Sequence, residues 1–179
     1  MPDLLRPLTA DYLETVRQWR NSPAVAQYMY TTDEITAEQQ QAWWARVEHD
    51  PTVRYWLIYH QDRPVGVANL YAISQRNRSC YWAFYLGDES LQGSGLGAKV
   101  ELAVLEYVFE ELKLNKLCCE VLSTNEKVVT LHEKFGFRRE GYFRQHIARG
   151  KAMLDVVALA LLRREWQQLR DTLRPRPRP

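Results

Sequence analysis

Residues 91–107, LQGSGLGAKVELAVLEY, place three alternate glycines directly before a long helical run. Glycine at this density indicates that something must approach the backbone closely. The N–H groups of Gly93, Gly95 and Gly97 would stand bare at the helix N-terminus, where unsatisfied donors and the helix dipole both favour an anion. We predict an anion-binding loop here, with a glycine turn needed only for tight packing as the alternative.

The residues around these glycines exclude one class of phosphate loop and argue against another. A nucleotide-hydrolase loop requires Lys and then Ser or Thr after its last glycine, whereas Ala98 and Lys99 follow Gly97. A dinucleotide fingerprint has a different glycine spacing and lies early in a βαβ unit, whereas this loop follows four expected strands. The anion is therefore expected to belong to another class of ligand.

The three cysteines, Cys80, Cys118 and Cys119, have neither a disulfide framework nor zinc-ligand spacing. They lie in apolar, strand-like stretches, where cysteine behaves as a small hydrophobic residue. We interpret them as packing residues and expect no metal site. Cys80 alone stays open as a nucleophile, because it lies near the glycine loop.

The elements that must position the loop follow from hydrophobic periodicity and from turn residues. Helices are expected after a short strand near the N-terminus, with Thr36 as the cap of the second one. The expected strands cover 54–60, 65–73, 80–87, 116–122, 137–147 and 153–162, and the later helices cover 95–114, 126–136 and 163–172. This order predicts a single α/β domain over 1–173, with a mixed central sheet of about seven strands flanked by helices. The tail 174–179, RPRPRP, is predicted to be disordered.

Composition limits the partners. The 179 residues suit one domain, and a net charge of +2 is too small to indicate a nucleic acid or membrane partner. No window approaches the roughly 18 apolar residues of a membrane-spanning helix, and residues 1–14 lack a secretion signal pattern. A cytoplasmic location is expected.

Two segments carry a resemblance to a known family. Residues 92–97, QGSGLG, resemble the Q/R-x-x-G-x-G/A signature of the GCN5-related N-acetyltransferase (GNAT) superfamily. Residues 125–137, NEKVVTLHEKFGF, are similar to its second motif, an Asn followed by a helix that ends in aromatic-Gly-Phe. Both occur in the family's order with a strand between them. The resemblance implies the GNAT fold and an acyltransferase that uses acetyl-CoA as co-substrate, without a metal.

The resemblance also implies which residues bind acetyl-CoA. The loop amides would cradle the pyrophosphate, and the end of strand 80–87 would splay so that its backbone pairs with the pantetheine arm. Two lysines are included for the phosphates, although solvated helix charges are the alternative for them. The implied cofactor-binding residues are Phe84, Tyr85, Leu86, Gln92, Gly93, Ser94, Gly95, Leu96, Gly97, Lys99, Asn125 and Lys134.

His132 departs from the family pattern. Many members have at this position a Tyr that protonates the leaving thiolate, and an imidazolium can also donate a proton. His132 is therefore the candidate catalytic general acid, with a packing role as the alternative. Glu120 and His146 are weaker candidates.

Residues 3–166 are similar to one branch, the UDP-4-amino-4,6-dideoxy-N-acetyl-β-L-altrosamine N-acetyltransferases of pseudaminic acid biosynthesis, on the route to the sugar that glycosylates flagellin. A small-molecule UDP-amino sugar is the implied acceptor. Gln40 stands where this branch is expected to have His. The candidate substrate residues are Arg17, Arg20 and Asn21 for a diphosphate, and Tyr28, Met29, Tyr30 and Trp82 for an aromatic wall.

Other functions remain open. A protein N-terminus, as in ribosomal-protein acetyltransferases, or a polyamine is the alternative acceptor. A non-enzymatic acetyl-CoA sensor is the third hypothesis, and a homodimer is an open alternative to a monomer.

Overall fold

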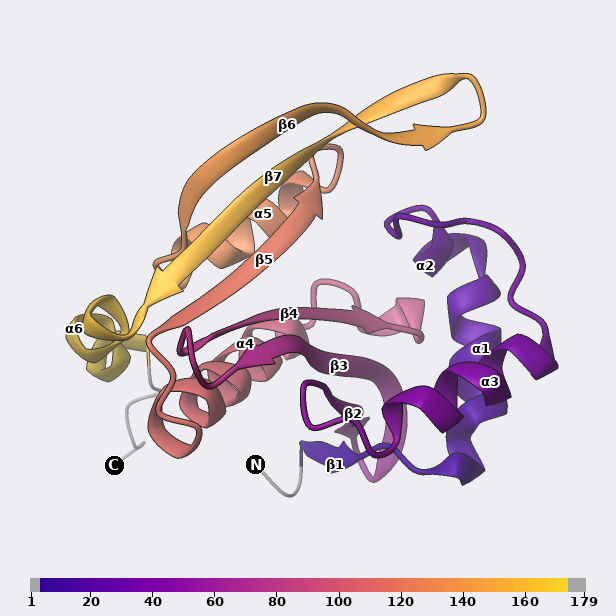
Figure 1. The fold of residues 1–179 in the computed structure, drawn as a ribbon, viewed down its shortest axis with the longest axis horizontal. Coiled ribbons are helices and arrows are strands. Elements are labelled where there is room, and N and C mark those ends of the chain that lie inside the picture. The colour runs from indigo at the N-terminus through magenta and orange to yellow at the C-terminus, as the bar shows by residue number, and fades with distance from the viewer. Residues whose placement is uncertain (1–3, 174–179) are drawn as a thin grey trace.

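In the computed structural model, residues 4–173 are described, and they form one seven-stranded sheet in the order β1-β2-β3-β4-β5-β7-β6 (Figure 1). Neighbouring strands are antiparallel, except β4 and β5, which are parallel. The predicted mixed sheet is confirmed, while the tail 174–179 lies outside the described residues. The strands are β1 (Leu5–Pro7), β2 (Arg54–His60), β3 (Arg63–Ser74), β4 (Ser79–Leu86), β5 (Lys116–Leu122), β6 (Arg138–Arg149) and β7 (Ala152–Leu162).

The helices begin and end close to the expected residues. Thr36 caps its helix with a reciprocal capping box to Gln39. Two differences arise: a short helix starts at Pro23, where the chain was expected only to turn, and the helix expected over 95–114 continues beyond Glu106 as a π-helical segment. The helices are α1 (Leu13–Asn21), α2 (Pro23–Ala26), α3 (Ala37–Val47), α4 (Leu96–Glu106), α5 (Glu126–Lys134) and α6 (Arg163–Leu173), with short turns at Ala10–Tyr12 (η1) and Glu89–Leu91 (η2) and the π segment at Tyr107–Glu111 (η3).

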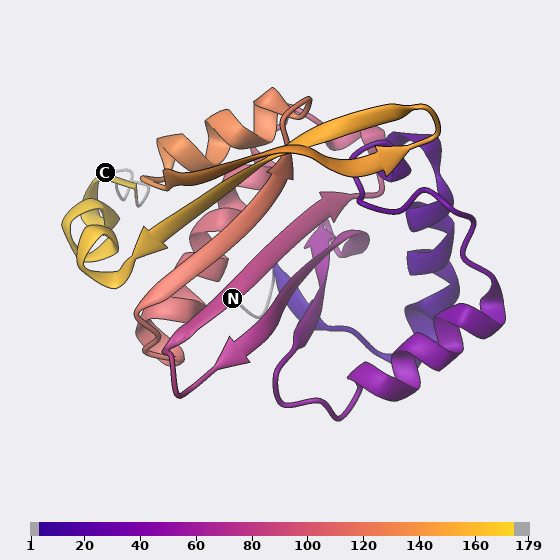
Figure 2. The same ribbon diagram turned by 45° about the horizontal axis from the view of Figure 1, so that its top comes forward.

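Helices α1 and α3 lie on one face of the sheet, and α4 and α5 lie on the other (Figure 2). Each face carries its own hydrophobic cluster. The larger cluster joins α4, α5 and α6 to the sheet through side chains such as Val104, Val129 and Trp166. The smaller one joins α1 and α3 to β2 and β3, with Val16 and Leu57 at its centre. Alternate residues of a strand reach opposite faces, so one strand serves both clusters.

The parallel pair β4–β5 separates along its length. The strands are in register only from Ser79–Lys116 to Tyr81–Cys118, whereas β4 stays paired with β3 as far as Leu86 and β5 with β7 as far as Leu122. Each strand therefore remains with its own half of the sheet, and the halves diverge toward the glycine loop (Figure 1). This splay agrees with the one expected at the end of strand 80–87.

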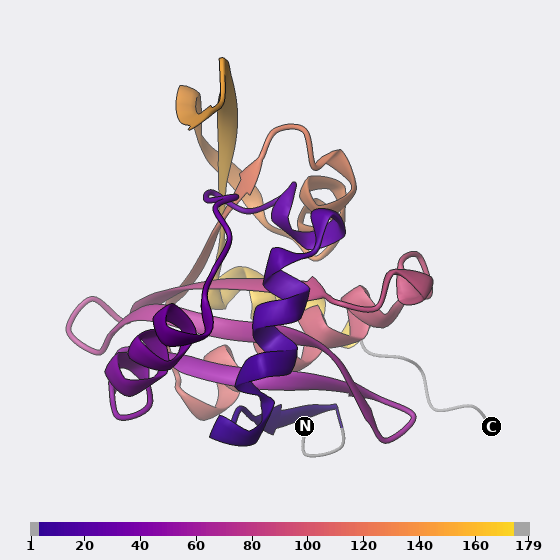
Figure 3. The same ribbon diagram turned by 90° about the vertical axis from the view of Figure 1, so that its right-hand side faces the viewer.

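The hairpin of β6 and β7 carries an irregularity near its tip, which rises above the rest of the chain in Figure 3. The register shifts between Phe143 and Ile147, where Gln145 has φ of +51°. The carboxylate of Asp155 accepts hydrogen bonds from the Gln145 backbone N–H and the Tyr142 hydroxyl, and the Tyr142 bond is the main cause of its lowered pKa. Beyond the bulge, Arg149 donates to the carbonyls of residues 27 and 29, and so ties the hairpin to the loop after α2.

Within residues 4–173, each helix is too short or too polar to cross a bilayer.

Candidate active site

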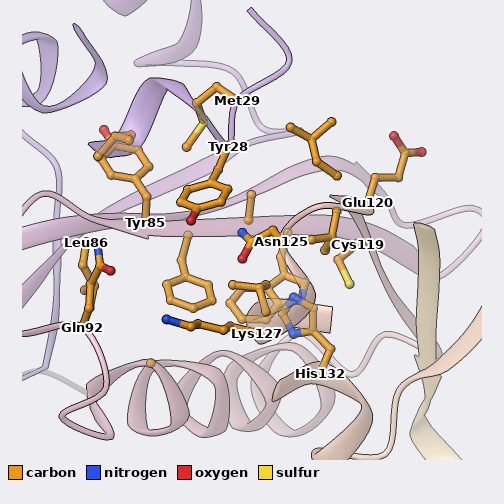
Figure 4. Close-up of a pocket in the computed structure, with 18 of the residues that line it drawn as sticks. Tyr28, Met29, Tyr85, Leu86, Gln92, Cys119, Glu120, Asn125, Lys127 and His132 are labelled. Atoms are coloured by element: carbon orange, nitrogen blue, oxygen red, sulfur yellow. The ribbon is translucent and has the colours of Figure 1, made fainter. Parts of the chain in front are cut away.

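A cavity of about 370 Å³ occupies the splay between β4 and β5 (Figure 4). Residues 82–86 of β4 and 119–122 of β5 form its walls. The glycine loop closes one end of it, the start of α5 lies beneath it, and the loop after α2 lies across it. Both predicted motifs therefore meet at one cavity, although they are about 30 residues apart in the sequence.

The glycine loop exposes backbone N–H groups at the start of α4. Gly95 is the N-cap of α4 with φ of +83°, and Gly93 has φ of +79°. No heavy atom lies within 4 Å of where a Cβ would stand at either glycine, so the loop surface is open. The N–H groups of Gly93, Gly95 and Gly97 have no acceptor within residues 4–173, while Ser94 braces the loop by donating to the Leu91 carbonyl at 2.6 Å. These donors fit the pyrophosphate of acetyl-CoA.

The predicted cofactor residues divide into two groups. Ser94, Gly95 and Leu96 shape the loop without lining the cavity, since Leu96 is buried in the core. The ones that line the cavity are Phe84, Tyr85, Leu86, Gln92, Gly93, Gly97 and Asn125.

The two predicted lysines do not reach the cavity. Lys99 is exposed on α4, and Lys134 is exposed at the last residue of α5, about 12 Å along the helix axis from its start. Lys127, in the first turn of α5, lines the cavity instead. The second motif was expected to contribute a lysine to the phosphates. The position along α5 decides which lysine reaches the cavity, because Lys127 is in the first turn and Lys134 is the last residue.

A different set of side chains faces the cavity from the side of α1 and α2. Tyr28, Met29 and Tyr30 line it as expected. The Tyr30 hydroxyl donates to Glu120 Oε2 at 2.7 Å, and the Tyr30 ring meets His146 edge-on at 6.5 Å between centroids. Burial first, and the Glu120 bond second, raise the pKa of Tyr30, so this hydroxyl remains a donor.

Glu120, a weaker candidate from the sequence, lines the cavity. Its β5 neighbours Cys119 and Val121 are buried in the cluster beneath α4 and α5, so Glu120 faces the opposite side of the sheet. It is the one carboxylate among the cavity-lining residues of the described chain. Strand alternation could have indicated its face, but not Tyr30 across from it.

The structure does not bring Arg17 and Asn21 to the cavity. Both donate to the carbonyl of Ile35, at 3.0 and 2.9 Å, and Arg17 also pairs with Glu14 at 2.8 Å. They hold the loop before α3, and the diphosphate contact expected of them has no support in this arrangement. Arg20 also lies outside the cavity lining; it is half-buried near Tyr85, and burial lowers the pKa of its guanidinium.

His132 lines the cavity from the α5 side and is only 3% exposed. Its Nδ1 lies 2.8 Å from Oε1 of Glu101, a buried residue of α4. Trp82, predicted as part of an acceptor wall, also lines the cavity, and its ring lies edge-on to His132 on the helix side of the sheet. Gln40 is buried in α3, outside the cavity.

Cys80 is expected to play no chemical part. Its side chain is fully buried, and burial raises the pKa of its thiol to about 12, so little thiolate forms at neutral pH. Cys80→Ala should leave kcat within about threefold of wild type, because direct transfer of an acetyl group from acetyl-CoA to an amine needs no enzyme thiol. Steady-state assays of thiol release measure this. Complete loss of turnover in a folded variant would contradict direct transfer.

No group of three or more His, Cys, Asp or Glu side chains within the described ranges is arranged to hold a metal ion.

Comparisons with known proteins agree on one family. Residues 4–138 match the model of the acetyltransferase (GNAT) domain. The acetyltransferase PseH of Campylobacter jejuni subsp. jejuni (strain 81-176) is 26% identical over 130 residues, covering 73% of this chain and 79% of that protein. The spermidine N(1)-acetyltransferase of Escherichia coli K12 is 27% identical over 137 residues, covering 76% and 73%.

A solved structure supports the same fold. The spermidine N-acetyltransferase of Vibrio cholerae, in complex with CoA and spermine, has a TM-score of 0.85 at 23% identity. The likeness covers 93% of this chain and 99% of that one.

Proposed function

This chain belongs to the GNAT acetyltransferase family, and from that premise we propose that it transfers the acetyl group of acetyl-CoA directly to the amino group of a UDP-linked amino-deoxy sugar. The reaction would be a step of pseudaminic acid biosynthesis in the cytoplasm. The observation that carries the proposal is the cavity in the splay, which is reached by an anion-binding loop at one end and by a Tyr–Glu pair at the other.

Acetyl-CoA supplies an activated acetyl thioester to this cavity. The free N–H groups of Gly93, Gly95 and Gly97 would hold its pyrophosphate, and Asn125 would hydrogen-bond the pantetheine arm. The β4 edge that faces the splay carries no strand partner beyond Tyr81, so its backbone groups are free to pair with that arm.

The proton balance assigns a role to each face of the sheet. An acceptor amine must lose a proton to attack, and Glu120 would take it, with the hydrogen bond from Tyr30 holding the carboxylate. The departing sulfur must gain a proton, and His132, which lines the cavity from the opposite face, would supply one. No covalent enzyme intermediate is required.

Three observations support a sugar nucleotide. The acceptor side offers Tyr28, Tyr30 and Tyr71, whose rings suit uracil or the methyl face of a deoxysugar. Glu120 is already bonded to Tyr30, which leaves no cluster of carboxylates among the lining residues for a polycation. Arg20 lies outside the cavity lining and has no carboxylate partner within 4–173, so it is the remaining candidate for a phosphate contact of a ligand that extends beyond the cavity.

A polyamine is the second candidate acceptor. It is favoured by the 27% identical spermidine N(1)-acetyltransferase and by the fold shared with the enzyme from Vibrio cholerae.

A panel of acceptors tests the proposal. Purified protein and acetyl-CoA are assayed for thiol release with UDP-4-amino-4,6-dideoxy sugars, spermidine and peptides with free N-termini. We expect kcat/KM for a UDP-amino sugar to exceed that for spermidine by at least about 100-fold, equivalent to about 2.8 kcal/mol. Preferential turnover of spermidine would replace the acceptor, and no turnover with any amine would overturn the enzyme assignment.

A further inference from the structure

Glu101 is a carboxylate in the middle of the hydrophobic core. It lies on α4 between the core residues Val100 and Leu105, and its side chain is 0% exposed. Burial raises the pKa of Glu101, while its bond to His132 acts in the opposite direction. An ionisable group is expensive to bury unless it is paired. An apolar residue at this position would pack without that cost.

Only one of the two oxygens of the Glu101 carboxylate has a hydrogen-bond partner within residues 4–173. Oε1 lies 2.8 Å from Nδ1 of His132, whereas Oε2 is buried and has no hydrogen-bond partner within residues 4–173. The imidazole is fixed further by two aromatic rings, Trp82 at 5.2 Å and 64° and Phe137 at 5.2 Å and 42°. The ring is therefore held on three sides, and its remaining contact is the cavity.

From this geometry we infer that Glu101 is a positioning residue, which fixes the tautomer and the orientation of His132 so that Nε2 serves as the proton donor in the cavity. The inference rests on the proposed function. An ionised carboxylate only accepts hydrogen bonds, so the nitrogen that faces it, Nδ1, must carry a proton. The exchangeable proton is then on Nε2, at the other edge of the ring.

The proton balance follows from this arrangement. As the carbon–nitrogen bond forms and the carbon–sulfur bond breaks, the electron pair of the broken bond stays on sulfur. The Nε2 proton moves to that sulfur, and His132 becomes neutral with its Nδ1 proton still held by Glu101. The proton released by the amine leaves on the other face through Glu120, and solvent recharges the imidazole.

Glu101 is the carboxylate in hydrogen-bond contact with His132, and the other groups packed around the imidazole are as follows. Among the described residues on β5, Cys119 is close to Glu101, and burial raises the pKa of its thiol, so it stays neutral. From β4 and from the chain after α5, the rings of Trp82 and Phe137 pack against the imidazole. On α5 itself, Glu133 pairs with Arg139 at 2.7 Å, and Lys127 lines the cavity.

The substitution Glu101→Gln keeps the shape of the side chain and removes its negative charge. We expect kcat to fall by about 30-fold while KM for acetyl-CoA stays within about twofold. The matched control is Glu133→Gln, which removes an exposed carboxylate beside His132 and should leave both kcat and KM unchanged.

Two further variants separate positioning from simple stabilisation. Glu101→Leu should leave the melting temperature unchanged or higher, since it removes a buried charge, and yet it should lose kcat as Glu101→Gln does. In a His132→Gln background, Glu101→Gln should cause no further loss of kcat. Multiplicative losses, or losses of kcat that follow the melting temperature, would overturn the positioning role.

A binary complex tests the inference without any acceptor. The ultraviolet absorbance of the thiolate of bound CoA is followed against pH. The thiolate should form at lower pH in the wild type than in Glu101→Gln and His132→Gln, which should agree with each other. Identical titrations of wild type and Glu101→Gln would overturn the inference. A clear difference, together with no turnover of any amine, would leave the positioning role standing and refute the proposed function.

Discussion

Gly95→Asp is expected to weaken acetyl-CoA binding at least about 100-fold, or about 2.8 kcal/mol. Gly95 has φ of +83° at the N-cap of α4, and the space where its Cβ would stand is open. An Asp side chain would therefore not collide with the protein. It would place a carboxylate over the free N–H groups, where the pyrophosphate must lie, and would add left-handed backbone strain of about 1 kcal/mol. Titration calorimetry with acetyl-CoA measures the change.

Two controls separate charge from strain. Gly95→Asn has nearly the same size, and Asn tolerates the left-handed region, so it should lose no more than about tenfold. Gly150→Asp adds the same side chain at another positive-φ glycine, with φ of +59° in the turn between β6 and β7, and should bind normally. If Gly95→Asp bound within tenfold of wild type, the loop would not be the pyrophosphate site.

Glu120→Gln is expected to lower kcat by about 100-fold, a typical loss for a missing general base. Gln keeps the shape and still accepts the hydrogen bond from Tyr30, so the cavity should not rearrange. Affinity for acetyl-CoA should stay within about threefold, because Glu120 faces the acceptor side of the sheet. Single-turnover thiol release, with the best amine of the panel, separates this chemical step from product release.

Two further variants serve as controls for the loss of kcat in Glu120→Gln. Tyr30→Phe removes only the bond that holds the carboxylate and should cost roughly five- to tenfold in kcat. Glu140→Gln removes a carboxylate that pairs with Lys116 at 2.6 Å outside the cavity, and should be silent. Retention of more than a third of the wild-type kcat by Glu120→Gln between pH 7 and 9 would exclude it as the base.

Local signals were enough for the elements and for the loop. Thr36 and Gln39 form a capping box within four residues of each other, and Gly136 ends α5 with φ of +90°. Such features depend on neighbours in the chain, which the sequence displays directly. The π-helical end of α4 was not predicted, because packing rather than a local motif buries both Val108 and Phe109.

The contacts of the site residues could not be predicted from local sequence patterns. The types of Arg17 and Asn21 suit a phosphate, but both are used by the carbonyl of Ile35. In the second motif, the helical turn selects Lys127 for the cavity and directs Lys134 away. The residue type limits the contacts that a side chain can make, and its neighbours in the tertiary structure determine which of these contacts form.

The sequence by itself determined the fold class, the order of the elements along the chain and the position of the glycine loop, because each depends on spacings of a few residues. Tertiary structure decided which groups surround the cavity. Glu101 meets His132 across 31 positions and Tyr30 meets Glu120 across 90, through the packing of two helices and the splay of two strands. Contacts of that range depend on how both faces of the sheet are filled, and no periodicity along the chain records them.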